Sequence, residues 1–193
     1  MFRLLASCIL RLMGWDTTPQ GYFPVKPKKY ILIVAPHTSN WDFIIGVLYR
    51  SVLGMTKAKY LGKAELFRPP FGFMFRWLGG TPVDRSTSQN MVDHVAKLLE
   101  QHTELAVALS PEGTRKRVDR LRTGFYNIAK KANVPIVMVG FDFKNKQVIF
   151  AEPFYASMDQ RKDFDHILRF LGPVQGRYPE KGLTHLMPGQ HVI

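Results

Sequence analysis

The 193-residue chain contains little cysteine, few acidic residues and no long apolar run. Its single cysteine, Cys8, excludes an internal disulfide framework and a zinc cluster built from several cysteines. A helix that spans a bilayer needs about 20 apolar residues, and no such segment is present. Lys and Arg number 27 against 15 Asp and Glu, so the net charge of +12 indicates an anionic partner: nucleic acid, an anionic membrane surface or a phosphorylated substrate.

The composition is that of a globular chain, with 46% hydrophobic and 22% charged residues. Residues 16–172 are expected to form the main domain, preceded by a helix over 1–15 and followed by an irregular tail over 173–193. Short apolar runs predict strands at 30–35, 57–61, 81–83, 104–109, 134–143 and 147–150. Helical patterns cover 41–53, 71–78, 87–102, 125–133 and 157–170, and 19–29 is expected to be an irregular connector. This alternation predicts an α/β fold with a mostly parallel central sheet flanked by helices.

The N-terminal segment, MFRLLASCILRLMGW, is apolar except for two arginines. Arg11 interrupts the apolar region and no small-residue cleavage site follows, so the segment does not read as a secretory signal. It predicts a short amphipathic helix with Arg3 and Arg11 on roughly one side. Such a helix either lies in a membrane interface or packs on the core, and the positive net charge favours the membrane.

Polar side chains follow the buried strands of the predicted sheet. His37 follows YILIVAP, Arg85 follows TPVD, and SPEGTR follows ELAVAL. Ligands of parallel sheets bind beyond the carboxyl ends of the strands, so these residues are expected to converge. A base, carboxylates and arginines at one pole predict a reaction site for a phosphorylated substrate.

His37 and Asp42 are separated by five positions, which corresponds to about 140° on a regular helix. They meet only if His37 precedes the helix and Asp42 lies in its first turn. Ser39 and Asn40 are both good N-cap residues and place the helix start there. A carboxylate that accepts from one imidazole nitrogen leaves the other free to take a proton, so the pair resembles the base and orienting acid of a triad without a protein nucleophile.

The segment from Glu112 to Arg115 and the separate Arg85 form a candidate anion site. The planar fork of arginine matches phosphate oxygens, and Gly113 allows the backbone to approach a ligand. Glu112 either orients Arg115, as an ion pair, or receives a substrate hydroxyl. The alternative is a solvated basic loop without function.

Four blocks occur in order: His37-x4-Asp42, GGTPVDR at 79–85, PEGTR at 111–115 and VPIV at 134–137. Together they resemble the glycerolipid acyltransferase family, typified by 1-acyl-sn-glycerol-3-phosphate acyltransferases, over roughly residues 30–155. The second block has Pro82 where an aromatic residue is common. In the third and fourth blocks Ser110, Lys116 and Met138 replace the usual Phe, Ser and Pro.

The resemblance implies a role for each matching residue. His37 would be the general base and Asp42 its orienting acid. Residues implied in acceptor binding are Arg85, Glu112, Gly113, Thr114, Arg115 and, as a weaker match, Lys63. Val134, Pro135 and Ile136 would belong to the acyl-donor region. No metal and no cofactor are implied beyond acyl-CoA or acyl carrier protein as co-substrate.

The resulting hypothesis is acyl transfer to a lysophospholipid hydroxyl in phospholipid biosynthesis, with another lysolipid as the alternative acceptor. We expect a peripheral protein on the cytoplasmic face of an anionic membrane. Its contacts would be residues 1–15 and part of the group Phe71, Phe73, Phe75 and Trp77, of which at least half are expected to be core. A nucleic-acid-binding module lacks a recognisable motif, and a serine hydrolase using Ser110 lacks the G-x-S-x-G turn.

Overall fold

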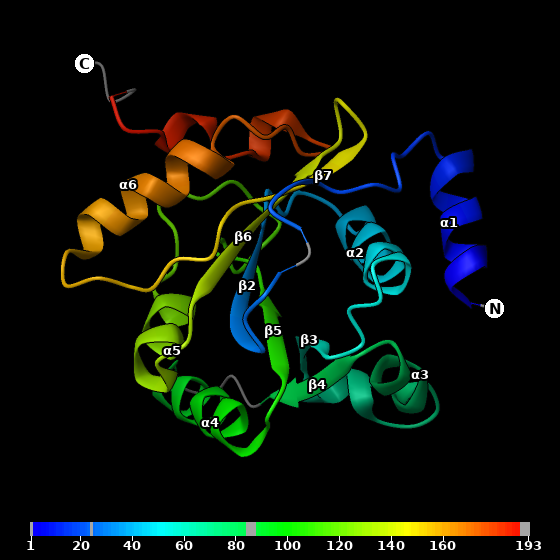
Figure 1. Cartoon of the computed structure of the whole chain (residues 1–193), viewed down its shortest axis with the longest axis horizontal. Coiled ribbons are helices and arrows are strands. Elements are labelled where there is room, and N and C mark those ends of the chain that lie inside the picture. Colours follow the sequence, from blue (N-terminus) through cyan, green and yellow to red (C-terminus); the bar gives the residue numbers. More distant parts are fainter. Residues whose placement is uncertain (1, 24, 84–87, 190–193) are drawn as a thin grey trace.

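The structure is a computed structural model that describes residues 2–23, 25–83 and 88–189 (Figure 1). Its strands are β1 (Gln20–Gly21), β2 (Lys29–Ala35), β3 (Ala58–Lys63), β4 (Gly80–Val83), β5 (Leu105–Leu109), β6 (Ile136–Asp142) and β7 (Gln147–Phe150). Its α-helices are α1 (Phe2–Leu12), α2 (Trp41–Val52), α3 (Gly72–Trp77), α4 (Ser88–Gln101), α5 (Gly124–Ala132) and α6 (Gln160–Leu171). Single 3-10 turns are η1 (Ala64–Phe67), η2 (Pro179–Lys181) and η3 (Thr184–Leu186).

The strands of the described chain form one seven-stranded sheet in the order β1-β7-β6-β2-β5-β3-β4. Every neighbouring pair is parallel except β6 and β7, which a tight turn joins antiparallel. The predicted α/β class and mostly parallel sheet are confirmed. The short strand β1 corrects the expected connector over 19–29, because Gln20 and Gly21 pair with Ile149 and Phe150.

The central strand β2 contributes alternate side chains to two apolar layers. Ile31 and Ile33 pack with α4, α5 and α6 on one face. Tyr30 and Leu32 pack with α1 and α2 on the other. A strand covered on both faces needs apolar residues at nearly every position, which is why YILIVA is an unbroken apolar run.

The N-terminal helix α1 packs on the core with one face and is exposed on the other. Ala6 and Leu10 are fully buried in the layer shared with α2, and Figure 1 shows α1 beside α2 at the edge of the molecule. The opposite side of α1 exposes Leu4, Leu5 and Leu12. One face therefore packs on the core while the other presents leucines to the surroundings.

The segment after α6 is part of the packed fold rather than a loose extension. Val174, Leu183 and Leu186 are buried, and the last two join the layer that contains α4, α5 and α6. Figure 1 shows this orange and red segment passing the same end of the sheet where α2 begins.

Candidate active site

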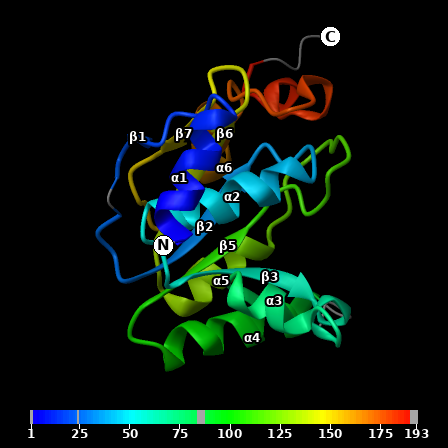
Figure 2. The same cartoon turned by 90° about the vertical axis from the view of Figure 1, so that its right-hand side faces the viewer.

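His37 lies just beyond the carboxyl end of β2, the strand in the middle of the sheet. β2 pairs in parallel with β5 on one side and with β6 on the other. The loop after β5 therefore emerges at the same edge as His37, and Figure 2 shows it extending to the same side as the start of α2. The expected convergence of the residues after β2 and β5 is confirmed.

His37 and Asp42 are in contact, with 3.1 Å between His37 Nδ1 and Asp42 Oδ2. The same carboxylate oxygen accepts from the backbone N–H groups of Thr38 and Ser39, each at 2.7 Å. Asp42 Oδ1 accepts from Ser39 Oγ at 3.1 Å. The side chain of Asp42 is 3% exposed, so these donors replace water around a buried carboxylate.

The start of α2 makes this contact possible, although the cap differs in detail from the sequence expectation. Asn40 occupies the N-cap position but its side chain makes no capping hydrogen bond. Instead Ser39 Oγ accepts from the Trp41 N–H at 3.1 Å. As predicted, His37 precedes the helix and Asp42 lies in its first turn, where its side chain turns back to the preceding loop.

The imidazole of His37 is held on one side and open on the other. Because Asp42 Oδ2 is an acceptor beside Nδ1, the neutral imidazole carries its proton on Nδ1 and has its lone pair on Nε2. Nε2 has no hydrogen-bond partner among the described residues, and the side chain is 25% exposed. The ring is thus oriented, and its free nitrogen can accept a proton from a bound molecule.

Glu112 supports the His37 loop rather than pairing with an arginine. Its side chain is 1% exposed. Its Oε1 accepts from the His37 backbone N–H at 2.7 Å, and its Oε2 accepts from Ser110 Oγ at 2.8 Å. Burial raises the pKa of Glu112 above its usual value, while the hydrogen bonds from His37 and Ser110 oppose that rise. No ion pair with Arg115 is found in the described part of the chain, which corrects that alternative.

The remaining residues of the PEGTR block line the surface of the same loop. Gly113 has a φ of +68°, a left-handed conformation that favours glycine. Thr114 Oγ1 accepts from the Lys116 N–H at 3.3 Å, and Arg115 is exposed. Arg85 lies outside the described residues. The backbone of Lys63 ends β3, and its side chain also lies outside what the structure describes.

The block proposed for the acyl donor lies at the opposite edge of the sheet. Val134, Pro135 and Ile136 are buried where β6 begins. Ile136 pairs with Ile31, six residues before His37, and at about 3.3 Å per residue this is roughly 20 Å from the histidine. The structure does not bring this block to His37, and its apolar side chains serve the core.

The sequence did not indicate that the C-terminal segment reaches the site. The Tyr178 N–H donates to Thr38 Oγ1 at 3.3 Å. A Cβ atom on Gly176 would lie 2.8 Å from the Thr38 side chain and 3.0 Å from Pro36. Only glycine allows so close an approach, but a single glycine in a segment rich in proline and glycine gives no such signal.

A model of the Acyltransferase family matches residues 16–142, which is about two thirds of the chain and includes His37, Asp42 and the PEGTR block. The chain belongs to the Acyltransferase family. Within this family it is 29% identical over 118 residues to a probable 1-acyl-sn-glycerol-3-phosphate acyltransferase of Mycoplasma pneumoniae. That match covers 58% of this chain and 44% of the relative, so the chain spans less than half of that protein's length.

The acyltransferase fold is also found in a solved structure. The crystal structure of the 1-acyl-sn-glycerophosphate (LPA) acyltransferase PlsC from Thermotoga maritima superposes with a TM-score of 0.59. It covers 88% of this chain and 74% of its own, at 16% sequence identity. The two chains therefore share a fold, with the predicted resemblance now supported by family and architecture together.

Proposed function

We propose that this chain is an O-acyltransferase that moves a fatty acyl group from a thioester to the hydroxyl of a lysophospholipid, with His37 as the general base. The observation that carries the proposal is the 3.1 Å contact between His37 and the buried Asp42, which leaves Nε2 free at the edge of the sheet. Membership of the Acyltransferase family supplies the reaction class. The named relatives favour 1-acyl-sn-glycerol-3-phosphate as acceptor and phospholipid biosynthesis as the setting.

In the first step His37 Nε2 accepts the proton of the acceptor hydroxyl as its oxygen attacks the thioester carbonyl carbon. The C–O bond forms, and the carbonyl electron pair moves to oxygen to give a tetrahedral intermediate. Asp42, next to Nδ1, stabilises the positive charge that develops on the imidazole. The loop is already rigid because Glu112 holds its backbone, so the base requires little reorganisation.

In the second step the tetrahedral intermediate collapses and the C–S bond breaks. The leaving thiolate, of CoA or of an acyl carrier protein, takes the proton from His37 Nε2, which returns the imidazole to its neutral form. No acyl-enzyme is needed. The hydroxyl of Ser110, the nucleophile of the hydrolase alternative, donates a hydrogen bond to Glu112 and supports that carboxyl group.

The phosphate of the acceptor is expected to lie against the loop after β5. Arg115 is exposed there and forms no ion pair with a described carboxylate, so its guanidinium is available to a phosphate. Gly113 in the same loop is exposed and carries no side chain, which allows a ligand to approach the backbone there. A lysolipid with a larger headgroup is the alternative acceptor, because the loop is open to solvent at Arg115.

The proposal is tested by a mass-spectrometric screen of lysolipid acceptors with one long-chain acyl-CoA and the matching acyl carrier protein. His37→Ala should reduce acyl transfer by about 10²-fold or more. His94→Ala, at an exposed histidine of α4, should leave it unchanged. Equal thiol release by wild type and His37→Ala, with both folded by circular dichroism, would exclude His37 as the base and refute the proposal.

We also propose that the protein acts as a peripheral protein at the cytoplasmic face of an anionic membrane. Among the described residues, no helix combines the length and apolarity that a bilayer span requires. The start of α1 meets the end of α3, because Phe2 and Trp77 contact each other with 5.1 Å between ring centroids. We propose that the exposed apolar residues of both regions face the membrane. This membrane surface comprises Phe2, Leu4, Leu5, Leu12, Phe71, Phe73 and Trp77.

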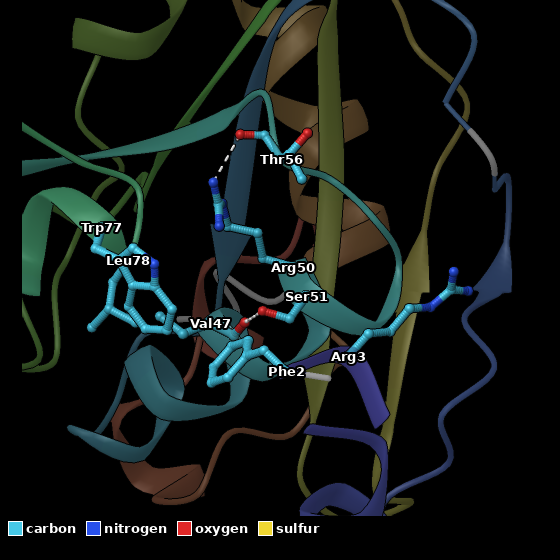
Figure 3. A pocket seen from close by; sticks show the side chains of 8 residues that line it. All are labelled: Phe2, Arg3, Val47, Arg50, Ser51, Thr56, Trp77 and Leu78. Carbon is cyan, nitrogen blue, oxygen red and sulfur yellow. Dashed lines mark hydrogen bonds between the residues drawn. The ribbon is translucent and has the colours of Figure 1, made fainter. Parts of the chain in front are cut away.

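The aromatic residues of the α3 region are more exposed than the sequence predicted. Phe71, Phe73 and Trp77 are 63%, 74% and 65% exposed, whereas half-buried Phe75 packs against Phe67. At least half of the four were expected to be core, and this expectation is wrong. A pocket of about 320 Å³ lies between α1, α2 and the end of α3, with Phe2 and Trp77 at its lining (Figure 3). Exposed aromatic groups beside arginines suit a lipid interface.

Vesicle co-sedimentation tests the membrane surface. Replacement of Phe73 and Trp77 by serine should reduce binding to vesicles of phosphatidylglycerol and phosphatidylcholine by about tenfold or more, since each ring buries a large apolar area. Met158→Ser, at a residue 95% exposed before α6, is the matched control and should change nothing. Unchanged binding by the double variant would show that the protein meets membranes through another surface.

A further inference from the structure

The backbone of residues 174–178, which we call the strap, is fixed across the carboxyl ends of β6 and β2. At β6, Gln175 O accepts from the Phe143 N–H at 2.8 Å. Val174 packs so closely on Gly140 that a Cβ atom there would lie 2.9 Å from Val174 Cγ2. Past Gly176, which touches the His37 loop, the strap ends where the Tyr178 N–H donates to Thr38. The strap is therefore held by hydrogen bonds and packing at the same end of the sheet as His37.

Arg177 stands between these two fixed positions. Its guanidinium carbon lies 5.2 Å from the centroid of the Trp41 ring, and Trp41 precedes Asp42 directly in the chain. The arginine is thus placed over the first residue of α2, at the rim of the His37 site. Both Arg177 and Trp41 are exposed, so a ligand can reach the guanidinium without any movement of the strap.

The charge of Arg177 is not neutralised within the described protein. None of its ion pairs involves Arg177. Asp42, Glu112 and Asp142 at this edge are buried, and their oxygens accept hydrogen bonds from the His37 loop, from Ser110 and from the turn after β6. Glu180, three residues after Arg177, is exposed and forms no ion pair with it. A guanidinium stacked on an aromatic ring keeps its N–H edge directed outward and matches the oxygens of a phosphate.

Arg177 also lies on a different side of His37 from Arg115. Arg115 belongs to the loop after β5, whereas the strap is anchored after β6, and these strands flank β2 on opposite sides. We propose that Arg177 binds a phosphate ester of one of the two substrates at the rim of the His37 site. This inference rests on the proposed acyl transfer. The phosphate comes either from the lysolipid acceptor or from the phosphopantetheine or nucleotide part of the thioester donor.

Steady-state kinetics with each substrate varied in turn separate these sources. Arg177→Ala should raise the KM of one phosphate-bearing substrate by about tenfold or more while kcat changes little, since a charge-assisted contact is lost in binding. Arg177→Lys should restore part of that loss. Arg161→Ala, at an exposed arginine of α6, is the control and should match wild type.

Phosphate-free analogues identify which substrate is bound. A monoacylglycerol replaces the lysophosphatidate, and an acyl N-acetylcysteamine thioester replaces acyl-CoA. If Arg177 binds the donor, Arg177→Ala loses efficiency with acyl-CoA but not with the short thioester, and the acceptor analogues show the converse if it binds the acceptor. Unchanged KM values for both phosphate-bearing substrates, or an equal loss with the phosphate-free pair, would overturn the proposal.

Calorimetric titration keeps this inference distinct from the proposed function. Desulfo-CoA and lysophosphatidate, the latter below its micelle concentration, are titrated into wild type, Arg177→Ala and Arg161→Ala without turnover. Weaker binding of one ligand to Arg177→Ala alone supports the phosphate contact even if no acyl transfer is ever detected. Equal binding of both ligands by all three proteins overturns it, whether or not wild type transfers acyl groups.

Discussion

The carboxyl and amino ends of the central strands differ in chemistry, although the family resemblance assigns sequence blocks at both ends to one reaction. At the carboxyl end, Asp42 after β2 and Glu112 after the neighbouring β5 are buried carboxyl groups with hydrogen-bond donors around each. At the amino end, Val134 and Ile136 are equally buried but wholly apolar, about 20 Å from His37. Burial alone therefore does not distinguish a site from a core. What distinguishes the carboxyl end is that both buried carboxyl groups hold the loop of one partly exposed histidine.

The largest effect at the carboxyl end is expected for Asp42→Asn. An amide carries no negative charge, and its NH2 group can donate to His37 Nδ1, so the imidazole loses its charge partner and its fixed tautomer. The turnover of acyl-CoA should fall by about 10²-fold or more. Asp165→Asn on α6 is the control. Near-normal turnover by Asp42→Asn would mean that the ends of the sheet do not differ in chemistry.

Glu112 tests whether the second buried carboxylate supports the loop. Glu112→Ala leaves the His37 N–H and Ser110 hydroxyl without their acceptor and should lower the free energy of unfolding by about 1–3 kcal/mol. Glu112→Gln keeps an acceptor for the His37 N–H and should lose less. Urea unfolding of the two variants measures the difference, and equal losses would contradict a hydrogen-bonding role.

The stability difference between wild type and Glu112→Gln is expected to depend on pH in a defined direction. Burial raises the folded-state pKa of Glu112 above its usual value of 4.5, so the folded protein holds that proton more tightly than the unfolded chain. The contribution of Glu112 to stability is therefore greatest below pH 4.5 and decreases as the pH rises through the folded pKa. Glutamine has no such proton. The stability of wild type relative to Glu112→Gln should fall over this range in urea titrations, and a constant or rising difference would contradict the direction of the shift.

The smallest effect is expected at the amino end. Ile136→Val removes one methylene from a fully buried side chain and should cost about 0.5–1.5 kcal/mol of stability. Because Ile136 does not lie at His37, the KM for acyl-CoA should stay unchanged when the variant is assayed well below its melting temperature. A rise of the KM for acyl-CoA without a change in the KM for the acceptor would show that the block at residues 134–136 contributes to donor binding.

The sequence predicted the central strands and the His37–Asp42 contact correctly because both depend on residues that are close together in the chain. The apolar runs predicted β2, β5 and β6, and the position of His37 between a buried strand and a good N-cap predicted its contact with Asp42. These depend on strand burial and on helix geometry over a few residues. The hydrogen-bond donor to Glu112 was not predictable in the same way. The His37 N–H comes close to Glu112 only because β2 and β5 pair in the sheet, whereas Arg115 is close to it in the sequence.

Long-range packing explains the other differences. The two-residue strand β1 exists only because β7 offers it an edge. The exposure of Phe73 and Trp77 depends on how α1 and α3 are placed relative to the core, which a cluster of aromatic residues in the sequence does not indicate. The approach of Gly176 to Thr38 depends on the path of the chain after α6.

The strap has a consequence for how the protein is made. The bond between Tyr178 and Thr38 joins positions 140 residues apart, whereas His37 meets its acid partner within one loop. During synthesis, His37 and Asp42 emerge from the ribosome well before the strap, whose contact with the His37 loop depends on residues about 140 positions later. Cleavage by a protease before residue 174 would therefore remove the strap and Arg177 while leaving the contact between His37 and Asp42 within the remaining chain.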